Sequence, residues 1–93
     1  MEVIITRSFL KDLKSKPKEV IHEVEDLVAK LEAATSLEKS GTDFRKMEGQ
    51  KKDENYYRIR LGTWRIGIEY INPKVIVIRI LARGAIYKHF PPQ

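Results

Sequence analysis

The sequence predicts an α+β fold, in which an N-terminal strand and a helical hairpin precede a three-strand antiparallel meander and one sheet packs on the helices. Three patterns predict it. Apolar residues recur at the spacing of one helical face between 20 and 31, polar and apolar residues alternate from 56 to 70, and 75–81 is almost continuously apolar. At 93 residues, we expect a single domain over 1–93 with one modest core.

The N-terminal third predicts a strand and two helices. Residues 2–6 are typical of a short strand, and either Thr6 or Ser8 is suited to cap a first helix. Pro17 suits the first turn of a second helix. The apolar stripe of that helix consists of Val20, Ile21, Val24, Leu27, Val28 and Leu31. A stripe of this kind predicts a helix that packs on the core.

Residues 33–55 show no regular pattern, and we expect loops there. Residues 40–43 are turn-rich, Phe44 and Met47 are expected to anchor the segment to the core, and 49–55 is expected to be exposed. The predicted order is therefore β-α-α-β-β-β, followed by one short helical turn within 83–93.

A hairpin around Gly62-Thr63 is the most informative feature of the chain. Side chains alternate between the two faces of a strand, so its apolar face consists of Tyr57, Ile59, Leu61, Trp64, Ile66, Ile68 and Tyr70. The opposite face carries Arg58, Arg60 and Arg65. A two-residue turn places Arg60 across from Arg65 and Arg58 across from Gly67. Like charges across a ladder destabilise a sheet by up to about 1 kcal/mol, so this face is suited to bind a polyanion.

The third strand of the meander adds further candidates to this face. Side chains alternate along this strand as well, so we expect Val77, Arg79, Leu81 and Arg83 on the same face as the hairpin arginines. A three-residue turn at 72–74 would also place Arg79 beside Gly67, whose missing side chain would leave an open floor between Arg58 and Arg79. Alternatively, Arg79 pairs with Glu69 on the neighbouring strand.

The net charge of +5 is unevenly distributed. Residues 1–44 contain 7 basic and 9 acidic side chains, whereas residues 45–93 contain 11 basic and 4 acidic ones. A basic region of this kind favours RNA, DNA or an acidic protein as the partner. The further candidate RNA-binding residues are Arg45, Lys46, Lys51, Lys52, Arg79 and Lys88.

Several classes of function are disfavoured. The chain has no cysteine and two separated histidines, which predicts no metal site, and we expect no cofactor because there is no phosphate-binding glycine loop. His89, with Glu48 or Glu54, is a candidate acid–base pair. No signal peptide or bilayer-spanning apolar segment is apparent, and we expect a cytoplasmic protein without membrane contact.

Two motifs resemble the RelE/ParE superfamily of toxins from type II toxin–antitoxin systems. They are Tyr57-Arg58-Ile59-Arg60-Leu61-Gly62-Thr63-Trp64-Arg65-Ile66 and, after the next strand, Arg83-x-x-Ile86-Tyr87. The opening Ser8-Phe9-x-Lys11-x-Leu13 is also similar, so the resemblance covers nearly the whole chain. It implies a RelE-like fold, a cognate antitoxin and, in the RelE branch, cleavage of mRNA on the ribosome with the RNA's own 2′-hydroxyl as nucleophile.

The resemblance also implies roles for individual residues. Arg58 and Arg60 would orient the 2′-hydroxyl and the phosphate. Arg65 and Arg83 would stabilise the transition state. Tyr87 would hold the base or assist the leaving oxygen.

One departure from the family pattern concerns the second motif. Relatives often carry a histidine before the late arginine and an acidic residue after it, where this chain has Ala82 and Ala85. This implies a slower enzyme, or one that relies on its arginines and on ribosomal groups. Two alternatives to mRNA cleavage stay open: a gyrase inhibitor like ParE, and an RNA-binding domain that does not cut.

Overall fold

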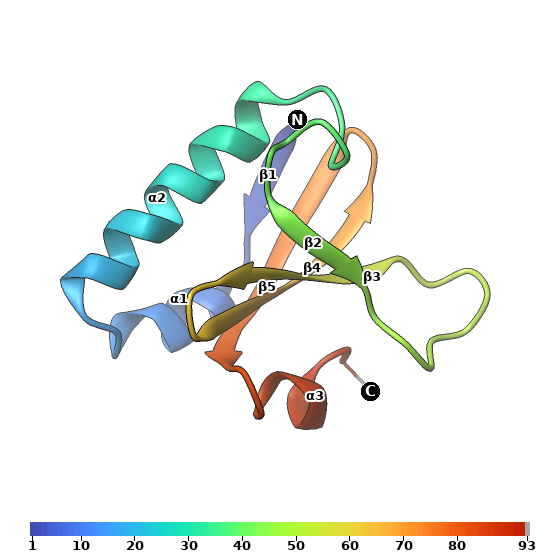
Figure 1. Cartoon of the computed structure of the whole chain (residues 1–93). Helices are drawn as coiled ribbons and strands as arrows, with labels where there is room; N and C mark the ends of the chain where they lie inside the picture. Colours follow the sequence, from blue (N-terminus) through green and yellow to red (C-terminus); the bar gives the residue numbers. More distant parts are fainter. Residues whose placement is uncertain (93) are drawn as a thin grey trace.

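The computed structural model describes residues 1–92, which form a five-stranded sheet with three helices (Figure 1). The elements are β1 (Glu2–Ile5), α1 (Arg7–Lys14), α2 (Lys18–Ala33), β2 (Asp43–Lys46), β3 (Tyr56–Leu61), β4 (Trp64–Ile71), β5 (Lys74–Ala82) and α3 (Ile86–His89). The strand order is β1-β5-β4-β3-β2. Strand β1 runs parallel to β5, and the other pairs are antiparallel. The α+β class is thus confirmed, with one more strand than expected.

The two long helices pack on one face of the sheet. The Thr6 side chain caps α1 by accepting a hydrogen bond from Phe9 N at 3.3 Å. Pro17 stands at the N-cap of α2. Buried side chains of both helices meet those of the strands in a main core: Phe9, Val20, Val24, Leu27, Leu31, Leu37, Ile59, Ile66, Ile68, Val75, Val77 and Ile80. The expected core-packing role of α2 is confirmed.

Strand β2 is the element that the sequence did not predict. It pairs with β3 over Asp43–Lys46, inside the segment expected to be irregular. An edge strand has only one neighbour, and in β2 only Phe44 packs inward against the main core. Its other three residues are charged and exposed, so no alternation of apolar residues marks it.

The predicted hairpin register is confirmed, because Arg58 pairs with Gly67 and Arg60 with Arg65. The next turn differs from the expectation. Ile71 pairs with Lys74, which leaves a two-residue turn, and a bulge beside Gly67 then restores the pairing of Gly67 with Arg79.

The bulge changes which face the residues of β5 occupy. The expectation for Val77 was wrong, because this side chain is buried in the main core. Ile78 instead joins Leu81 on the other side of the sheet. A bulge inserts one extra residue into one strand and so breaks the period of two on which the expectation rested.

A second, smaller cluster lies on the sheet face opposite α2 and is built around α3. Its buried members are Met47, Ile86 and Phe90, against which Tyr56, Ile78 and Leu81 pack. The short C-terminal helix expected from the sequence is therefore present, and β5 contributes to both clusters. No helix within residues 1–92 is long and apolar enough to cross a bilayer.

Candidate functional site: an arginine cluster beside a basic groove

Arg65 is the centre of the site. It opens β4 and is only 5% exposed. Its Nη1 donates to the carbonyl oxygens of Gly62 and Trp64, both at 2.9 Å. The hairpin turn therefore holds the guanidinium in a fixed place. Within residues 1–92, Nε and Nη2 have no acceptor and remain available to a ligand.

The other four predicted catalytic residues surround Arg65. Burial, followed by the positive charges of Arg60, Arg58 and Arg83, lowers the pKa of Arg65, while Tyr87 acts in the opposite direction. The sheet register places Arg60 beside Arg65, and the turn after β5 brings Arg83 to the hairpin, where its backbone N donates to Thr63 O at 3.1 Å. Residues from the hairpin and from the segment after β5 thus lie close enough to Arg65 for their charges to affect its pKa.

No ion pair within residues 1–92 involves any of the four arginines of the site, which are Arg58, Arg60, Arg65 and Arg83. Moreover, Nη1 of Arg58 is buried and has no hydrogen-bond partner there. A buried donor without an acceptor costs about 1–3 kcal/mol, and more when it is charged. An anion bound at this cluster would supply the missing acceptor.

Strand β2 enlarges the basic surface. Its register places Arg45 directly beside Arg58, so a second pair of like charges faces each other across the ladder. Lys46 reaches over the ring of Tyr57, at 5.9 Å from its centroid. Both residues were predicted to bind RNA, and the unexpected strand explains how they come to lie beside the hairpin.

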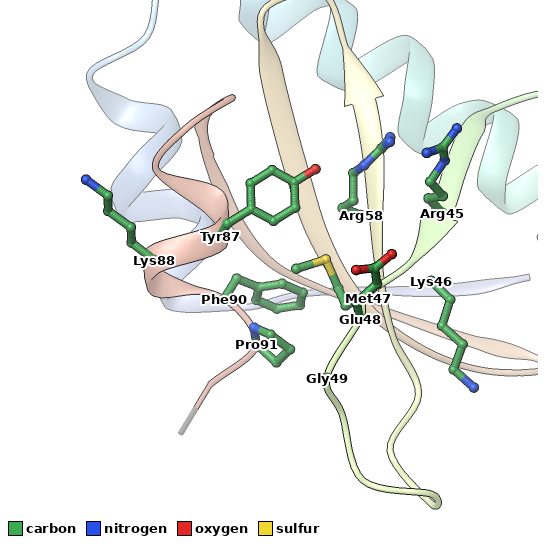
Figure 2. Close-up of a pocket in the computed structure, with 10 residues that line it drawn as sticks. All are labelled: Arg45, Lys46, Met47, Glu48, Gly49, Arg58, Tyr87, Lys88, Phe90 and Pro91. Atoms are coloured by element: carbon green, nitrogen blue, oxygen red, sulfur yellow. The ribbon is translucent and has the colours of Figure 1, made fainter.

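A groove of about 510 Å³ opens between α3 and β2 (Figure 2). We call it the α3 groove. It is lined by Arg45, Lys46, Met47, Glu48, Gly49, Arg58, Tyr87, Lys88, Phe90 and Pro91. Arg58 and Tyr87 therefore belong to the groove and also lie near Arg65.

The floor expected above Gly67 is not open. The ring of Phe90 covers it, and a Cβ built on Gly67 would lie 2.7 Å from Phe90 Cγ. The expectation that Gly67 leaves an empty space between Arg58 and Arg79 was therefore wrong. Its missing side chain makes room for α3 instead.

Arg79 has a partner that the sequence did not suggest. It pairs with Asp12 of α1, from Nε at 2.7 Å and from Nη2 at 3.2 Å, and not with Glu69. The hydrogen bond to Asp12 raises the pKa of Arg79 above its ordinary value. Asp12 also accepts from the backbone N of Ile80 at 3.0 Å. Arg79 thus joins α1 to β5, and its Nε and Nη2 are bonded to Asp12.

The remaining candidates divide between the groove and its surroundings. Lys88 lines the α3 groove, whereas Lys51 and Lys52 are exposed in the segment between β2 and β3 and are not part of its lining. Of the proposed acid–base pair, Glu48 lines the groove and His89 does not. Within residues 1–92, no ion pair joins His89 to Glu48 or to Glu54, and Glu54 instead accepts a hydrogen bond from Lys51 N at 2.8 Å.

Sequence reasoning missed the role of Phe90 and of Asp12. Phe90 is an aromatic residue among polar and proline residues near the end of the chain, which gives a weak indication of burial. Asp12 is the only acidic residue in the first helix. Neither pattern identifies the partner, because both contacts span long distances in sequence.

Comparison with known proteins gives consistent results. Residues 3–87 match a family model described as the ParE toxin of type II toxin–antitoxin system, parDE. Over 91 residues, the chain is 36% identical to Toxin RelE3 of Methanocaldococcus jannaschii, covering 98% of this chain and 100% of that protein.

Solved structures are similar over almost the same length. The RelB-RelE antitoxin-toxin complex from Methanococcus jannaschii matches with a TM-score of 0.76 and 34% identity, over 95% of this chain and 99% of that chain. An archaeal RelE-RelB complex from Pyrococcus horikoshii matches with a TM-score of 0.69 and 26% identity, over 89% and 94%. YafQ from E. coli, at 15% identity and a TM-score of 0.69, over 92% and 97%, shares the fold.

Proposed function

The chain belongs to the ParE toxin family of type II toxin–antitoxin systems, within the RelE/ParE superfamily, and we propose that it is a ribosome-dependent mRNA endonuclease. The observation that carries this proposal is the grouping of Arg58, Arg60, Arg83 and Tyr87 around the buried Arg65, through the hairpin register and the bond from Arg83 N to Thr63 O. Arginine offers a planar fork of donors that matches phosphate oxygens. A cluster without carboxylate partners is suited to a phosphate that gains negative charge during reaction.

The reaction needs no cofactor. The 2′-oxygen of the RNA attacks the adjacent phosphorus as its proton leaves, and the bond from phosphorus to the 5′-oxygen breaks as that oxygen takes up a proton. The products are a 2′,3′-cyclic phosphate and a 5′-hydroxyl end. Arg58 and Arg60 orient the reacting groups, while Arg65 and Arg83 stabilise the charge on the phosphoryl oxygens. Tyr87 holds the base or assists the leaving oxygen.

Proton transfer is the weaker part of this site. Arginine has a very high pKa, so it keeps its proton at neutral pH and is a poor general base. Ala82 and Ala85 stand where relatives often carry a histidine and an acidic residue. The chemistry therefore rests on orientation and charge stabilisation, with proton transfer assisted by ribosomal groups, and the rate is lower than that of relatives with the histidine.

A cognate antitoxin is part of the proposal. Two of the solved relatives are toxins in complex with a RelB antitoxin. The antitoxin would neutralise this chain by covering the basic face or by displacing the C-terminal segment. Co-expression with a candidate antitoxin, followed by purification of a stable complex, tests this part.

One assay separates cleavage from its alternatives. A defined message is translated with the protein present, the 5′ ends of the RNA are mapped, and gyrase supercoiling is assayed in parallel. Cuts in phase with the codons support the proposal. Inhibition of supercoiling would instead support a ParE-like function. RNA binding without either effect would indicate a domain that does not cut.

A further inference from the structure

The α3 groove contains a carboxylate that the proposed chemistry does not use. Glu48 follows β2 and lines the groove together with Arg45, Lys46, Arg58 and Lys88. Although these cationic residues line the same groove, Glu48 forms no ion pair among residues 1–92. In Figure 2, Glu48 lies on the same side of the groove as Arg58 and Arg45, and Tyr87 and Phe90 lie on the other.

The chemistry of the lining separates the groove into two parts. Arg45 and Arg58 are neighbours across the ladder and are suited to bind phosphate. The floor is apolar, because Met47 and Phe90 are buried there. A phosphate gains nothing from that floor and is repelled by the carboxylate of Glu48. The part of a nucleotide that suits it is therefore the uncharged base.

Tyr87 completes this base site. This residue is 61% exposed and borders the groove, so its ring is accessible for stacking. Stacking of a base on an aromatic side chain stabilises the complex and does not depend strongly on the identity of the base. Selectivity must then come from a polar group at the edge of the base, and Glu48 is placed to supply it.

We propose that the α3 groove binds one base of single-stranded RNA and that Glu48 selects bases bearing an amino group. This inference rests on the proposed function for the position of the phosphate beside Arg58. An ionised carboxylate only accepts hydrogen bonds. Cytosine, adenine and guanine each present an amino group to it, whereas uracil presents one N–H between two carbonyl oxygens that repel the carboxylate. A well-placed side chain discriminates between bases through such pairs, and we expect roughly a tenfold preference over uracil, equivalent to about 1.4 kcal/mol.

The test measures binding and does not depend on cleavage. Short 2′-O-methyl oligouridines, which lack the nucleophile and cannot be cut, each carry one cytosine or adenine at a different position. Their affinities are measured by fluorescence anisotropy at one salt concentration, because binding of this kind is strongly salt-dependent. We expect a single position at which the amino-bearing base binds about tenfold more tightly than uracil.

Two variants complete the experiment. In Glu48→Gln the amide both donates and accepts, so the preference at that position should fall to about twofold or less. Glu38→Gln removes the same charge from an exposed residue outside the groove and should keep the preference. The proposal is overturned if Glu48→Gln retains the wild-type preference, if it strengthens binding of every oligonucleotide equally, or if the wild type shows no preferred position.

Failure of the proposed function gives a different result. If mapping of 5′ ends shows no cleavage while Glu48 still controls base preference, then the nuclease proposal fails and the base site stands. If codon-phased cuts appear and Glu48→Gln abolishes them without changing base preference in binding, then Glu48 acts in catalysis and the selection proposal fails.

Discussion

The aromatic ring of Phe90 lies directly on the backbone of Gly67, so that a Cβ at position 67 would come within 2.7 Å of it. This contact joins α3 to the centre of the sheet. It also determines where Tyr87 stands, because Tyr87 and Phe90 are separated by less than one helical turn. The geometry of the site thus depends on a glycine that touches no substrate.

Gly67→Ala should displace α3. Overpacking of a buried site typically costs about 1–3 kcal/mol, and we expect a loss of unfolding free energy in this range together with loss of cleavage. Thermal unfolding and the ribosome assay measure the two effects. Gly84→Ala is the matched control, because nothing lies within 4 Å of a Cβ there, and its stability should change by no more than about 0.5 kcal/mol. Equal effects of both substitutions would contradict the importance of the contact.

Arg65→Ala and Arg83→Ala should each reduce cleavage about a hundredfold or more, because each removes donors that face the developing charge. Arg65→Lys should restore little, since an ammonium group cannot hold the two carbonyls of the turn and bind phosphate at the same time. Cleavage on programmed ribosomes is the measurement, with circular dichroism to verify folding. Arg7→Ala, an exposed residue of α1, is the charge control. Unchanged cleavage by a double variant carrying both Arg65→Ala and Arg83→Ala would contradict the assignment of this site.

Arg58→Met should stabilise the free protein by about 0.5–1 kcal/mol, because it removes a like-charge neighbour of Arg45 and a buried donor without an acceptor. The same change should weaken RNA binding. The slope of the logarithm of the binding constant against the logarithm of salt concentration should fall in magnitude by about one. Denaturant unfolding and a salt titration of affinity measure the two effects. A less stable variant would show that Arg58 serves the fold and not a ligand.

Asp12→Ala should destabilise the protein by about 2 kcal/mol, because Asp12 accepts three hydrogen bonds that link α1 to β5. Arg79→Gln should lower stability by less, since the bond from Ile80 N to Asp12 remains. If Arg79 serves the fold, then Arg79→Gln keeps RNA affinity within about twofold of wild type. A loss of RNA affinity as large as that caused by Arg58→Met would show that Arg79 also binds RNA. Chemical denaturation and anisotropy supply both measurements.

The hairpin is the part that local pattern determines. A period of two around a two-residue turn leaves one register that buries Ile59, Ile66 and Ile68, and any slip by one residue would expose them. The pairing of Arg60 with Arg65 follows from that register. The same reasoning places the stripe of α2 on the core, because a helix of period 3.6 has one apolar face to bury.

Tertiary structure decided the features that complete the site. Strand β2 forms because β3 offers a free edge, which places Arg45 beside Arg58. Because of the bulge at Gly67, Val77 lies on the core face of the sheet and Ile78 on the opposite face. A long-range ion pair holds Arg79 against Asp12. Above all, the ring of Phe90 packs on Gly67, because only a residue without a side chain leaves room for the ring at that distance. The periodicity of a sequence records which face each residue occupies. It does not record which distant segment will cover that face, and in this protein that segment carries Tyr87.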